Sequence, residues 1–442
     1  METKEIFSKQ IKIISILKSL IKKIEKKKDF VMLKEFYYSS WSYCLGYLRI
    51  KELLYQKNLM FKIKIFFSNI YLQFFFSDLK KIQIKNLKKK NFNKVVLSWC
   101  YKNDFKKNIY YDRYFSSNSK SDNNTLWLLI SMDGYFTDHI ENVIIFKNKV
   151  SFISFIKFMI TSFIKSLINF NLNNFFILEN FYIKTEKTIS KILSIIKVKN
   201  FVLPYEGQIF QNYILSNVNK KASVETIGYI HSALPPLPSE YIKRQGSPKK
   251  IIVHGNLQKK ILSKNLGWSR KEIFLKKSAR YKHQNKKNFK NKIFLPMTFE
   301  DKNLLLIYLE NFLKKQKKNS LSPFKIKNHP LMNDSEKHLS FIQNINQLLK
   351  KYYFKFDKKN KNKESKSIFF SATASIIETL EYGIDVIHII NDPIMEVHNP
   401  ITWKFIETKK IDENIYSYKL KKKSSYISFQ DKNFKFSEWI KI

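Results

Sequence analysis

Three small hydroxyl residues lie close together near the carboxyl end of the chain, in the stretch FFSATASIIETLEYG that starts at Phe369. The apolar residues before Ser371 predict a β-strand, and the spacing after Ser375 predicts an α-helix that stops at Gly383. At a strand-to-helix turn, free backbone N–H groups and the helix dipole favour an anion, and small hydroxyls add hydrogen-bond donors. Ser371, Thr373 and Ser375 are therefore candidate ligands of a phosphate.

The same turn can also be explained without a ligand. Ser375 and Glu378 have the spacing of a capping box, in which these two side chains satisfy N–H groups at the start of the helix. Ser371 and Thr373 lie outside that box, so a capped helix and a phosphate site are compatible.

A histidine ends another predicted strand. His329 follows the strand predicted at residues 324–327, and Pro330 fixes the turn that aims it. A histidine at such a position can donate a hydrogen bond to a phosphate or titrate near neutral pH. The alternative is that His329 has only a structural role.

A glutamate ends a third predicted strand, at residues 201–205. Glu206 follows that strand, and Gly207 after it lets the backbone turn. A carboxylate that faces a cleft can serve as a general base when its surroundings raise its pKa. The alternative is that Glu206 caps the helix that begins near Gln208.

Short apolar runs alternate with longer amphipathic stretches over the last three quarters of the chain. This pattern predicts an α/β fold with parallel strands covered by helices. In open α/β sheets, ligands bind at the carboxyl ends of the strands, which is where Glu206, His329 and Ser371 are placed. The predicted strands lie at residues 126–131, 142–146, 175–178, 201–205, 225–231, 251–253, 273–276, 293–295, 324–327, 368–370 and 384–390.

The 442 residues are enough for two domains. PPLP at 235–238 and GSPKK at 246–250 contain the proline and glycine typical of a linker. We expect residues 1–120 to form a helical or irregular part of the first domain, residues 121–240 its Rossmann-like part, and residues 250–410 a second Rossmann-like domain. The two domains would then face one cleft, with the glutamate on one side and the histidine and hydroxyl turn on the other.

Composition narrows the class of partner. A net charge of +45 attracts polyanions, so a nucleic-acid-binding protein is a rival interpretation. Against it, the lysines are spread along the whole chain, and neither a zinc-finger pattern nor an aromatic RNA-binding signature is present, so no specific nucleic acid is expected. The two cysteines, Cys44 and Cys100, form neither a disulfide framework nor a zinc cluster, which indicates a reducing compartment.

No secretory leader and no membrane-spanning helix are expected, which indicates a cytoplasmic protein. Near the N-terminus, however, four apolar residues fall on one face of a predicted helix whose other faces carry lysines: Ile13, Leu17, Leu20 and Ile24. Such a helix can lie on an anionic membrane as a peripheral contact, or it can pack this stripe on its own domain.

The strand-end residues resemble the motifs of two-domain GT-B glycosyltransferases. The acidic-acidic-glycine, His-Pro and paired Ser/Thr motifs of bacterial sialyltransferases and polysialyltransferases correspond here to YEG at 205–207, HP at 329–330 and SATAS at 371–375. The stretches LPYEGQ, IGYIHSALPP and KSARY also resemble a family of uncharacterised bacterial surface carbohydrate biosynthesis proteins. The resemblance covers roughly residues 201–391, and it departs from the motif at Tyr205, where the first acidic residue would stand.

The resemblance implies a transferase that moves a sugar from a nucleotide-activated donor to a carbohydrate or lipid-linked carbohydrate acceptor, and it favours a CMP-linked donor. It implies that Glu206 removes the proton of the acceptor hydroxyl. His329 and the hydroxyls of Ser371 and Thr373 would stabilise the departing phosphate. No Asp-x-Asp pair of the kind that holds a divalent ion on a nucleotide diphosphate is present, so no metal and no cofactor are expected.

The resemblance also implies that the tail, residues 411–442, packs back on the first domain. Further candidates for substrate contacts stand at strand-to-loop junctions or on the last helix: His231, Gly255, Arg280, Thr298 and Glu378.

Other activities fit the same fold. A sugar-nucleotide epimerase or a polyol-phosphate transferase uses two such domains and a histidine, because fold alone does not determine function. A non-catalytic scaffold is a further alternative, since the YEG motif keeps only one carboxylate.

Overall fold

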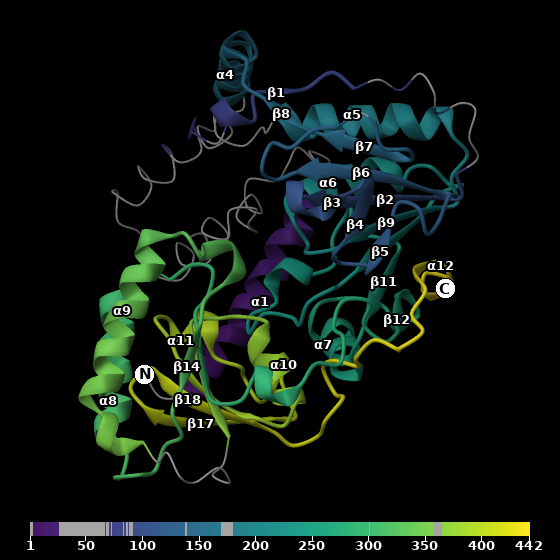
Figure 1. Cartoon of the computed structure of the whole chain (residues 1–442). Helices are drawn as coiled ribbons and strands as arrows, with labels where there is room; N and C mark the ends of the chain where they lie inside the picture. The colour runs from purple at the N-terminus through teal and green to yellow at the C-terminus, as the bar shows by residue number, and fades with distance from the viewer. Residues whose placement is uncertain are drawn as a thin grey trace.

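The computed structural model describes residues 3–25, most of 67–168, 180–299, 301–356 and 365–442. Two large β-sheets, each with helices packed on it, make up most of this part of the chain (Figure 1). The predicted α/β class with two Rossmann-like units is therefore confirmed.

The first sheet has seven strands, all parallel, in the order β12-β11-β10-β9-β2-β6-β7. The interior strands β2 and β6 are buried along their whole length, as expected for a parallel sheet covered on both faces. The chain moves outward from β2 to β7 and then returns to build the other half from β9 to β12. The direction of winding therefore reverses between β2 and β9, which is where open α/β sheets bind ligands. The bounds are β2 Lys94–Cys100, β6 Thr125–Ser131, β7 Val143–Phe146, β9 Asn200–Pro204, β10 Glu225–Tyr229, β11 Lys250–Val253 and β12 Ile273–Leu275.

The second sheet has six strands in the order β14-β13-β15-β16-β18-β17. The first four in this order are parallel, and β18 and β17 are antiparallel. Here the winding reverses between β13 and β15. The bounds are β13 Lys292–Phe294, β14 Lys325–Lys327, β15 Lys366–Phe370, β16 Asp385–Ile389, β17 Ile406–Asp412 and β18 Ile415–Leu420.

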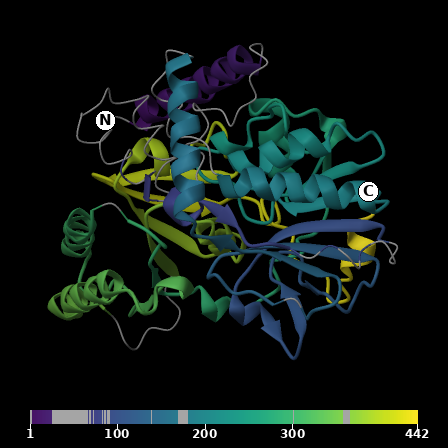
Figure 2. The same ribbon diagram turned by 90° about the horizontal axis from the view of Figure 1, so that it is seen from above.

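The helices fall into three groups. Those connecting the strands of the first sheet are α4 Phe152–Ile168, α5 Asn180–Ile195, α6 Ile209–Val218 and α7 Asn256–Asn265. Those of the second unit are α8 Lys302–Lys315, α9 Glu336–Lys351, α10 Ser375–Glu381 and α11 Pro393–Glu396. The terminal helices are α1 Thr3–Glu25 and α12 Phe436–Trp439, and Figure 2 shows the carboxyl end of the chain beside the first sheet. Short strands complete the fold: β1 Asp78–Leu79 pairs with β8 Asn148–Lys149, and β3 Phe105–Lys106, β4 Ile109–Asp112 and β5 Ser117–Asn118 form a small sheet.

The expected helical or irregular character of residues 1–120 is wrong for its second half. Strand β2 stands at the centre of the first sheet, and Cys100 at its end is buried. The apolar run VVLSWC is flanked by lysine- and asparagine-rich segments, which hid it as a strand. Cys44 and the strand predicted at residues 175–178 lie outside the described residues.

The predicted boundary at residues 235–250 is also wrong. Strands β11 and β12 pair with the first sheet, so the chain passes to the second sheet only between Leu275 and Lys292. The PPLP segment is not a linker because it is buried: the Pro236 carbonyl accepts a hydrogen bond from the Trp403 indole at 3.2 Å. Prolines that pack between two units give the same sequence signal as a linker.

The tail begins later than expected, because β17 and β18 belong to the second sheet and residue 411 falls inside β17. After Leu420 the chain returns to the first unit. The Ser428 N–H donates to the His254 carbonyl at 2.6 Å, and the Gln430 N–H donates to the Tyr281 carbonyl at 2.8 Å.

Helix α1 packs inside the molecule. Ile13 and Leu17 of its predicted stripe are buried, and the Gln10 amide donates to the carbonyls of Ile394 and Val397, each at 2.8 Å. These contacts favour the alternative that α1 packs its apolar stripe on its own protein, and the side chains of Leu20 and Ile24 lie outside the described residues. In the part of the chain that the structure describes, no helix is long and apolar enough to cross a membrane.

Candidate functional site

The turn after β9 places Glu206 at the point where the winding of the first sheet reverses. Gly207 has φ +67°, and a Cβ there would lie 2.1 Å from the Glu240 carbonyl oxygen, so only glycine fits. The Arg244 guanidinium donates to the carbonyls of both Gly207 and Glu240. This clamp holds the backbone in the conformation that turns the Glu206 side chain outward.

Glu206 does not cap helix α6. The helix N-cap is Gln208, and Oε1 of Gln211 accepts from the N–H groups of Glu206 and Gln208 at 3.0 and 3.3 Å. The capping interpretation is therefore wrong, and the carboxylate is available for another role.

The Glu206 carboxylate is partly buried and still reaches solvent. Its side chain is 34% exposed, Oε1 is 3.3 Å from Nε2 of His231, and Oε2 accepts from the Gln208 amide. Burial raises the pKa of Glu206 to about 7. The Arg280 charge and the Gln208 hydrogen bond lower this pKa, and the Glu240 charge raises it. A carboxyl group whose pKa lies near the operating pH is suited to act as a general base.

His231 is a neutral partner of this carboxylate. Burial, together with the positive charge of Arg280, lowers its pKa well below the ordinary value. Its ring packs edge-on against the ring of Tyr114, with centroids 4.6 Å apart. His231 therefore positions Glu206 and is not itself a source of charge.

Arg280, in the segment that follows β12, acts electrostatically on residues of both units. Its charge lowers the pKa values of Glu206 and His231, which follow strands of the first sheet. It also lowers the pKa values of His329 and Glu378, which belong to the second unit. Within the described residues its exposed guanidinium makes no ion pair and no side-chain hydrogen bond. An arginine between two units with its guanidinium unpaired is suited to an anionic ligand.

Glu378 of α10, in the second unit, is another carboxyl group on which the Arg280 charge acts. The side chain is 8% exposed, and its carboxyl group has no hydrogen-bond partner in the described part of the chain. Burial raises its pKa to about 7, while the charges of Arg280 and Lys327 lower it. The predicted capping box is wrong, because the helix begins at Ser375 and its N-cap is Ala374.

The hydroxyl turn follows β15, where the winding of the second sheet reverses. Ser371 has φ +53°, a conformation that costs energy for a non-glycine residue. It is held there because its carbonyl accepts from Nε2 of His388 at 2.8 Å and its N–H donates to the Ile389 carbonyl at 3.0 Å. Oγ1 of Thr373 accepts from the Ser375 N–H at 3.4 Å, which leaves the threonine hydroxyl hydrogen for another acceptor.

His329 and Thr298 stand at the ends of the neighbouring strands. His329, after β14, is half-buried, and burial lowers its pKa, followed by the charges of His338 and Arg280. It is therefore a neutral imidazole at pH 7. Thr298 follows β13 and is half-buried beside the point of reversal.

Gly255 serves packing. It is the N-cap of α7, and a Cβ there would lie 2.1 Å from the Tyr426 carbonyl oxygen. The returning tail fills the space in front of this glycine, which explains the glycine by packing, and a substrate contact at Gly255 stays a prediction.

Tyr205, at the position of the first acidic residue of the motif, points into the core. It is fully buried, and its hydroxyl donates to Oδ1 of Asn212 at 2.8 Å. A second carboxylate comes instead from Glu240, whose charge raises the pKa of Glu206. Sequence reasoning missed Glu240 because it directly follows the PPLP segment, which we interpreted as a linker.

Three other residues near the site were missed. Tyr101 follows β2, and the charge of Glu206 contributes to raising its pKa, after burial. Burial and the same charge raise the pKa of Tyr114. Lys327, the last residue of β14, acts on Glu378. The apolar runs that precede Tyr101 and Lys327 were the available signals.

A separate cavity lies beside helix α1. An open cavity of about 610 Å³ is lined by α1, Pro236–Pro238 and the Ile401–Thr402 turn, and its lining contains neither a carboxylate nor a histidine. Among the described residues, no group of three or more His, Cys, Asp or Glu side chains has the arrangement of a metal site.

Comparison with known proteins gives weak structural similarities. No family model matches the chain, and no curated protein matches it. A solved glycosyltransferase from Rickettsia africae ESF-5 is similar at 10% identity, covering 72% of this chain and 88% of that chain with a TM-score of 0.33. The lipopolysaccharide outer core galactosyltransferase WaaB is similar at 11% identity, covering 68% and 82%, with a TM-score of 0.34. The wall teichoic acid polymerase TagF is similar at 9% identity, covering 76% and 79%, with a TM-score of 0.32.

TM-scores of this size establish no shared fold. None of the three is described as a sialyltransferase, and that part of the resemblance stays a prediction.

Proposed function

We propose that this protein is a glycosyltransferase that moves a sugar from a nucleotide-activated donor to a hydroxyl group of a carbohydrate acceptor. One observation carries the proposal: the charge of unpaired Arg280 acts on Glu206 of the first unit and on Glu378 and His329 of the second. We infer from this shared neighbour that a base with a pKa near 7 and a set of candidate phosphate-binding groups lie close to one another. That combination suits attack by a hydroxyl group on a carbon that carries a phosphate leaving group.

In the proposed reaction the acceptor oxygen forms a bond to the anomeric carbon while the bond from that carbon to the phosphate oxygen breaks. The electron pair of the broken bond stays on the phosphate oxygen, and the proton of the acceptor hydroxyl passes to Glu206. His231 and the Gln208 amide hold the carboxylate in place for this transfer.

The leaving phosphate is stabilised on the second side of the cleft. Arg280 and Lys327 supply positive charge, and Ser371 and Thr373 supply short hydroxyl donors. His329, as a neutral imidazole, can donate one hydrogen bond. Because two side-chain cations act on this region, we expect transfer without a divalent metal. A CMP-linked donor and a surface-carbohydrate acceptor are the finer parts of the proposal.

Binding of nucleotides tests the proposal. We expect one of CMP, CDP, UDP and GDP to raise the melting temperature, since a ligand at one hundred times its Kd stabilises the folded state by about 2.7 kcal/mol. Arg280→Gln should abolish the shift. Arg270→Gln is the matched control, because Arg270 is an exposed arginine that directly precedes β12 and contributes to none of the pKa shifts of Glu206, His329 and Glu378.

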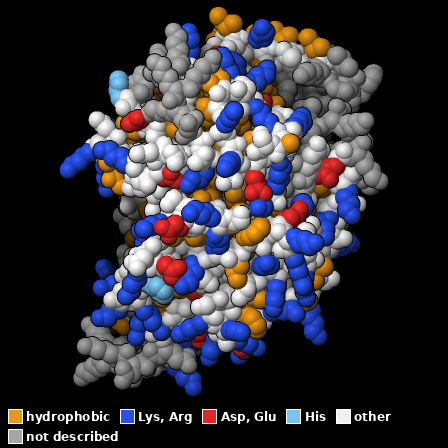
Figure 3. Space-filling view, turned by 90° about the vertical axis from the view of Figure 1, so that its right-hand side faces the viewer, with side chains coloured by type: hydrophobic (Ala, Val, Ile, Leu, Met, Phe, Trp, Pro, Cys, Tyr) orange, Lys and Arg blue, Asp and Glu red, His pale blue; other side chains and the backbone are white. Residues whose placement is uncertain are grey.

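Sugar transfer from the nucleotide sugar that corresponds to the bound nucleotide should then be measured with a labelled donor. If none of the four nucleotides binds, or if both arginine variants bind equally well, the proposal is wrong. Salt-dependent binding of random oligonucleotides, without a nucleotide-induced rise in melting temperature, would favour the nucleic-acid-binding alternative. The distribution of charge argues against that alternative, because the lysines and arginines are spread over the visible surface and do not form one patch (Figure 3).

A further inference from the structure

Helix α4 carries an apolar surface that the described fold leaves uncovered. In Figure 1 it stands at one end of the molecule, away from both sheets, and in Figure 3 apolar side chains gather at that same end. Five apolar residues follow the three- and four-residue spacing of one helical face, and all are exposed: Ile153, Ile156, Ile160, Ile164 and Leu167. Ile153 is 81% exposed, which is unusual for isoleucine, and a contiguous apolar surface of this kind marks an interaction site.

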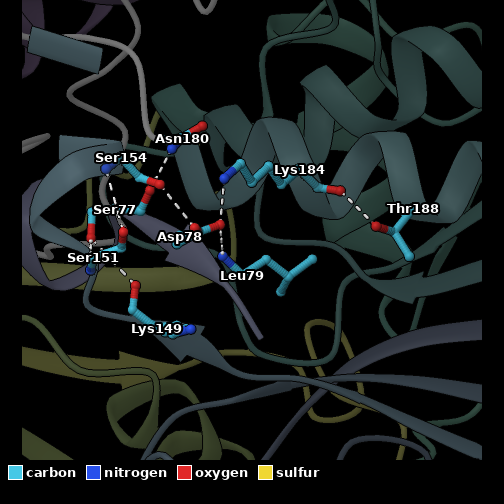
Figure 4. Close-up of polar contacts among 9 residues, drawn as sticks. All are labelled: Ser77, Asp78, Leu79, Lys149, Ser151, Ser154, Asn180, Lys184 and Thr188. Carbon is cyan, nitrogen blue, oxygen red and sulfur yellow. Dashed lines mark hydrogen bonds and ion pairs between the residues drawn. The ribbon is translucent and has the colours of Figure 1, made fainter. Parts of the chain in front are cut away.

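The helix is held at its base by a polar cluster (Figure 4). The Ser151 N–H donates to Oγ of Ser77 at 2.7 Å, and Oγ of Ser154 donates to Oδ2 of Asp78 at 2.9 Å. Asp78 also forms an ion pair with Lys184 of α5. Burial alone would raise the pKa of Asp78, but the Lys184 and Ser154 contacts outweigh it and hold the pKa below its ordinary value. The first turn of α4 is therefore fixed to β1 and α5.

The side of the helix opposite the apolar stripe faces the protein. The ring of Phe155 packs edge-on against the ring of Phe74, with centroids 5.5 Å apart. Because Phe155 is about half a turn around the helix from Ile153 and Ile160, this contact directs the stripe outward.

The charge next to the stripe selects its partner. Between Glu141 and Glu179 the sequence contains four lysines and no carboxylate. Lys157 is exposed and lies one turn after Ile153, at the edge of the stripe. An apolar helical face bordered by lysines is complementary to a bilayer whose headgroups are negative. A second copy of this chain is a poor partner, because it carries the same net charge of +45.

We propose that α4 docks the protein on the surface of an anionic lipid bilayer, with its apolar stripe inserted among the headgroups and the helix lying in the plane of the membrane. The 17 residues of α4 extend only about 26 Å, and the helix does not qualify as a membrane span. The proposal does not rest on the proposed glycosyltransferase activity, and either can fail without the other.

Flotation of the full chain with vesicles tests this docking. The wild-type protein should float with vesicles of phosphatidylcholine and phosphatidylglycerol, and it should bind vesicles of phosphatidylcholine alone about tenfold more weakly or less. The double variant Ile153→Asp/Ile160→Asp should lose about tenfold or more of the binding to anionic vesicles. Both positions are exposed, so the melting temperature should not change.

The matched control is Ile307→Asp/Leu339→Asp, because these residues are similarly exposed on α8 and α9. It should float like the wild type. A single variant, Lys157→Glu, should weaken binding to anionic vesicles and leave binding to neutral vesicles unchanged.

Three results would overturn the proposal. The first is a wild-type protein that binds neither kind of vesicle or binds both equally. The second is equal flotation of the two double variants. The third is a wild-type dimer in sedimentation equilibrium that the α4 variant converts to a monomer, without vesicle binding, which would assign the stripe to a second copy.

Discussion

Oε1 of Glu206 lies 3.3 Å from Nε2 of His231, at the carboxyl ends of the neighbouring strands β9 and β10. The imidazole is kept neutral because burial lowers its pKa well below the ordinary value, so it offers the carboxylate one N–H and no charge. Glu206 therefore keeps a pKa of about 7, which an imidazolium at the same distance would lower. The pair is arranged so that the glutamate, and not the histidine, takes up a proton near neutral pH.

Replacing Glu206 with glutamine should abolish most of the proposed transfer without weakening nucleotide binding. Glutamine keeps the size and hydrogen-bonding shape but cannot accept the proton, so the rate of transfer should fall roughly 10²–10⁴-fold. Transfer rate and nucleotide Kd are to be measured on the same variant. The control is Glu225→Gln, at the opposite end of β10. Transfer by Glu206→Gln at the rate of the control would show that another group is the base.

The pH dependence of transfer should report the pKa of Glu206 and its shift by Glu240. The base must be ionised, so the rate should fall as pH drops below about 7, by about tenfold per pH unit well below the pKa. Removing the negative charge with Glu240→Gln should move this limb to lower pH, because a nearby negative charge raises the pKa of a carboxyl group. Rate profiles of the two proteins from pH 5 to 9 make the comparison. A limb that stays in place or moves to higher pH would exclude Glu240 as a neighbour of the base.

Replacing Ser371 and Thr373 together with alanine should weaken nucleotide binding more than it destabilises the fold. Two hydrogen bonds to a charged phosphate are worth about 1.5–3 kcal/mol each, so Kd should rise by at least tenfold. The only side-chain hydrogen bond of the pair that the structure shows within the described residues is the 3.4 Å contact of Thr373 with the Ser375 N–H, whose loss should cost no more than about 1 kcal/mol. Isothermal titration and thermal melting separate the two effects. Lower stability with an unchanged Kd would make these hydroxyls caps only.

Replacing Glu378 with glutamine should stabilise the protein at high pH. The pKa of Glu378 is raised from 4.5 to about 7 in the folded state, so between these values the folded protein holds a proton that the unfolded chain releases. Stability therefore falls as pH rises through this range, and the variant lacks that loss. The gain over the wild type should be about 1–3 kcal/mol at pH 8 and close to zero at pH 4.5. Denaturant unfolding at the two pH values measures it, and an equal difference at both would show that ionisation of Glu378 is not involved.

The strand-end positions of the candidate residues were predictable because their signals are local. An apolar run followed by a polar or glycine residue marks the end of a buried strand, as in Glu206-Gly207 and in the turn after Phe370. Parallel strands of one sheet end at one edge, so the sequence pattern also predicted that such residues would line a cleft. Strand β2 was missed where lysine-rich flanks surround the apolar run.

Pairing between distant segments could not be predicted in the same way. Whether β11 and β12 join the first or the second sheet depends on hydrogen bonds to β10, and the misleading prolines at 236 and 238 pack in the interior. The assignment of Tyr205 to the core and Glu206 to the cleft likewise depends on what covers each side of the turn. The hydrogen bond from Arg244 to the Gly207 carbonyl joins residues 37 positions apart, so no pattern in the sequence near Gly207 could predict it.

The sequence by itself determined the α/β class, the strand-to-loop positions of Glu206, His329 and the hydroxyl turn, and the basic, apolar character of residues 142–178. The tertiary structure alone decided that Arg280 lies between the two units, that Glu240 and not residue 205 supplies the second carboxylate, and that α4 keeps an uncovered apolar face. The physical reason is that periodicity and turn residues act over a few positions, whereas burial and electrostatic proximity depend on which distant segments pack together.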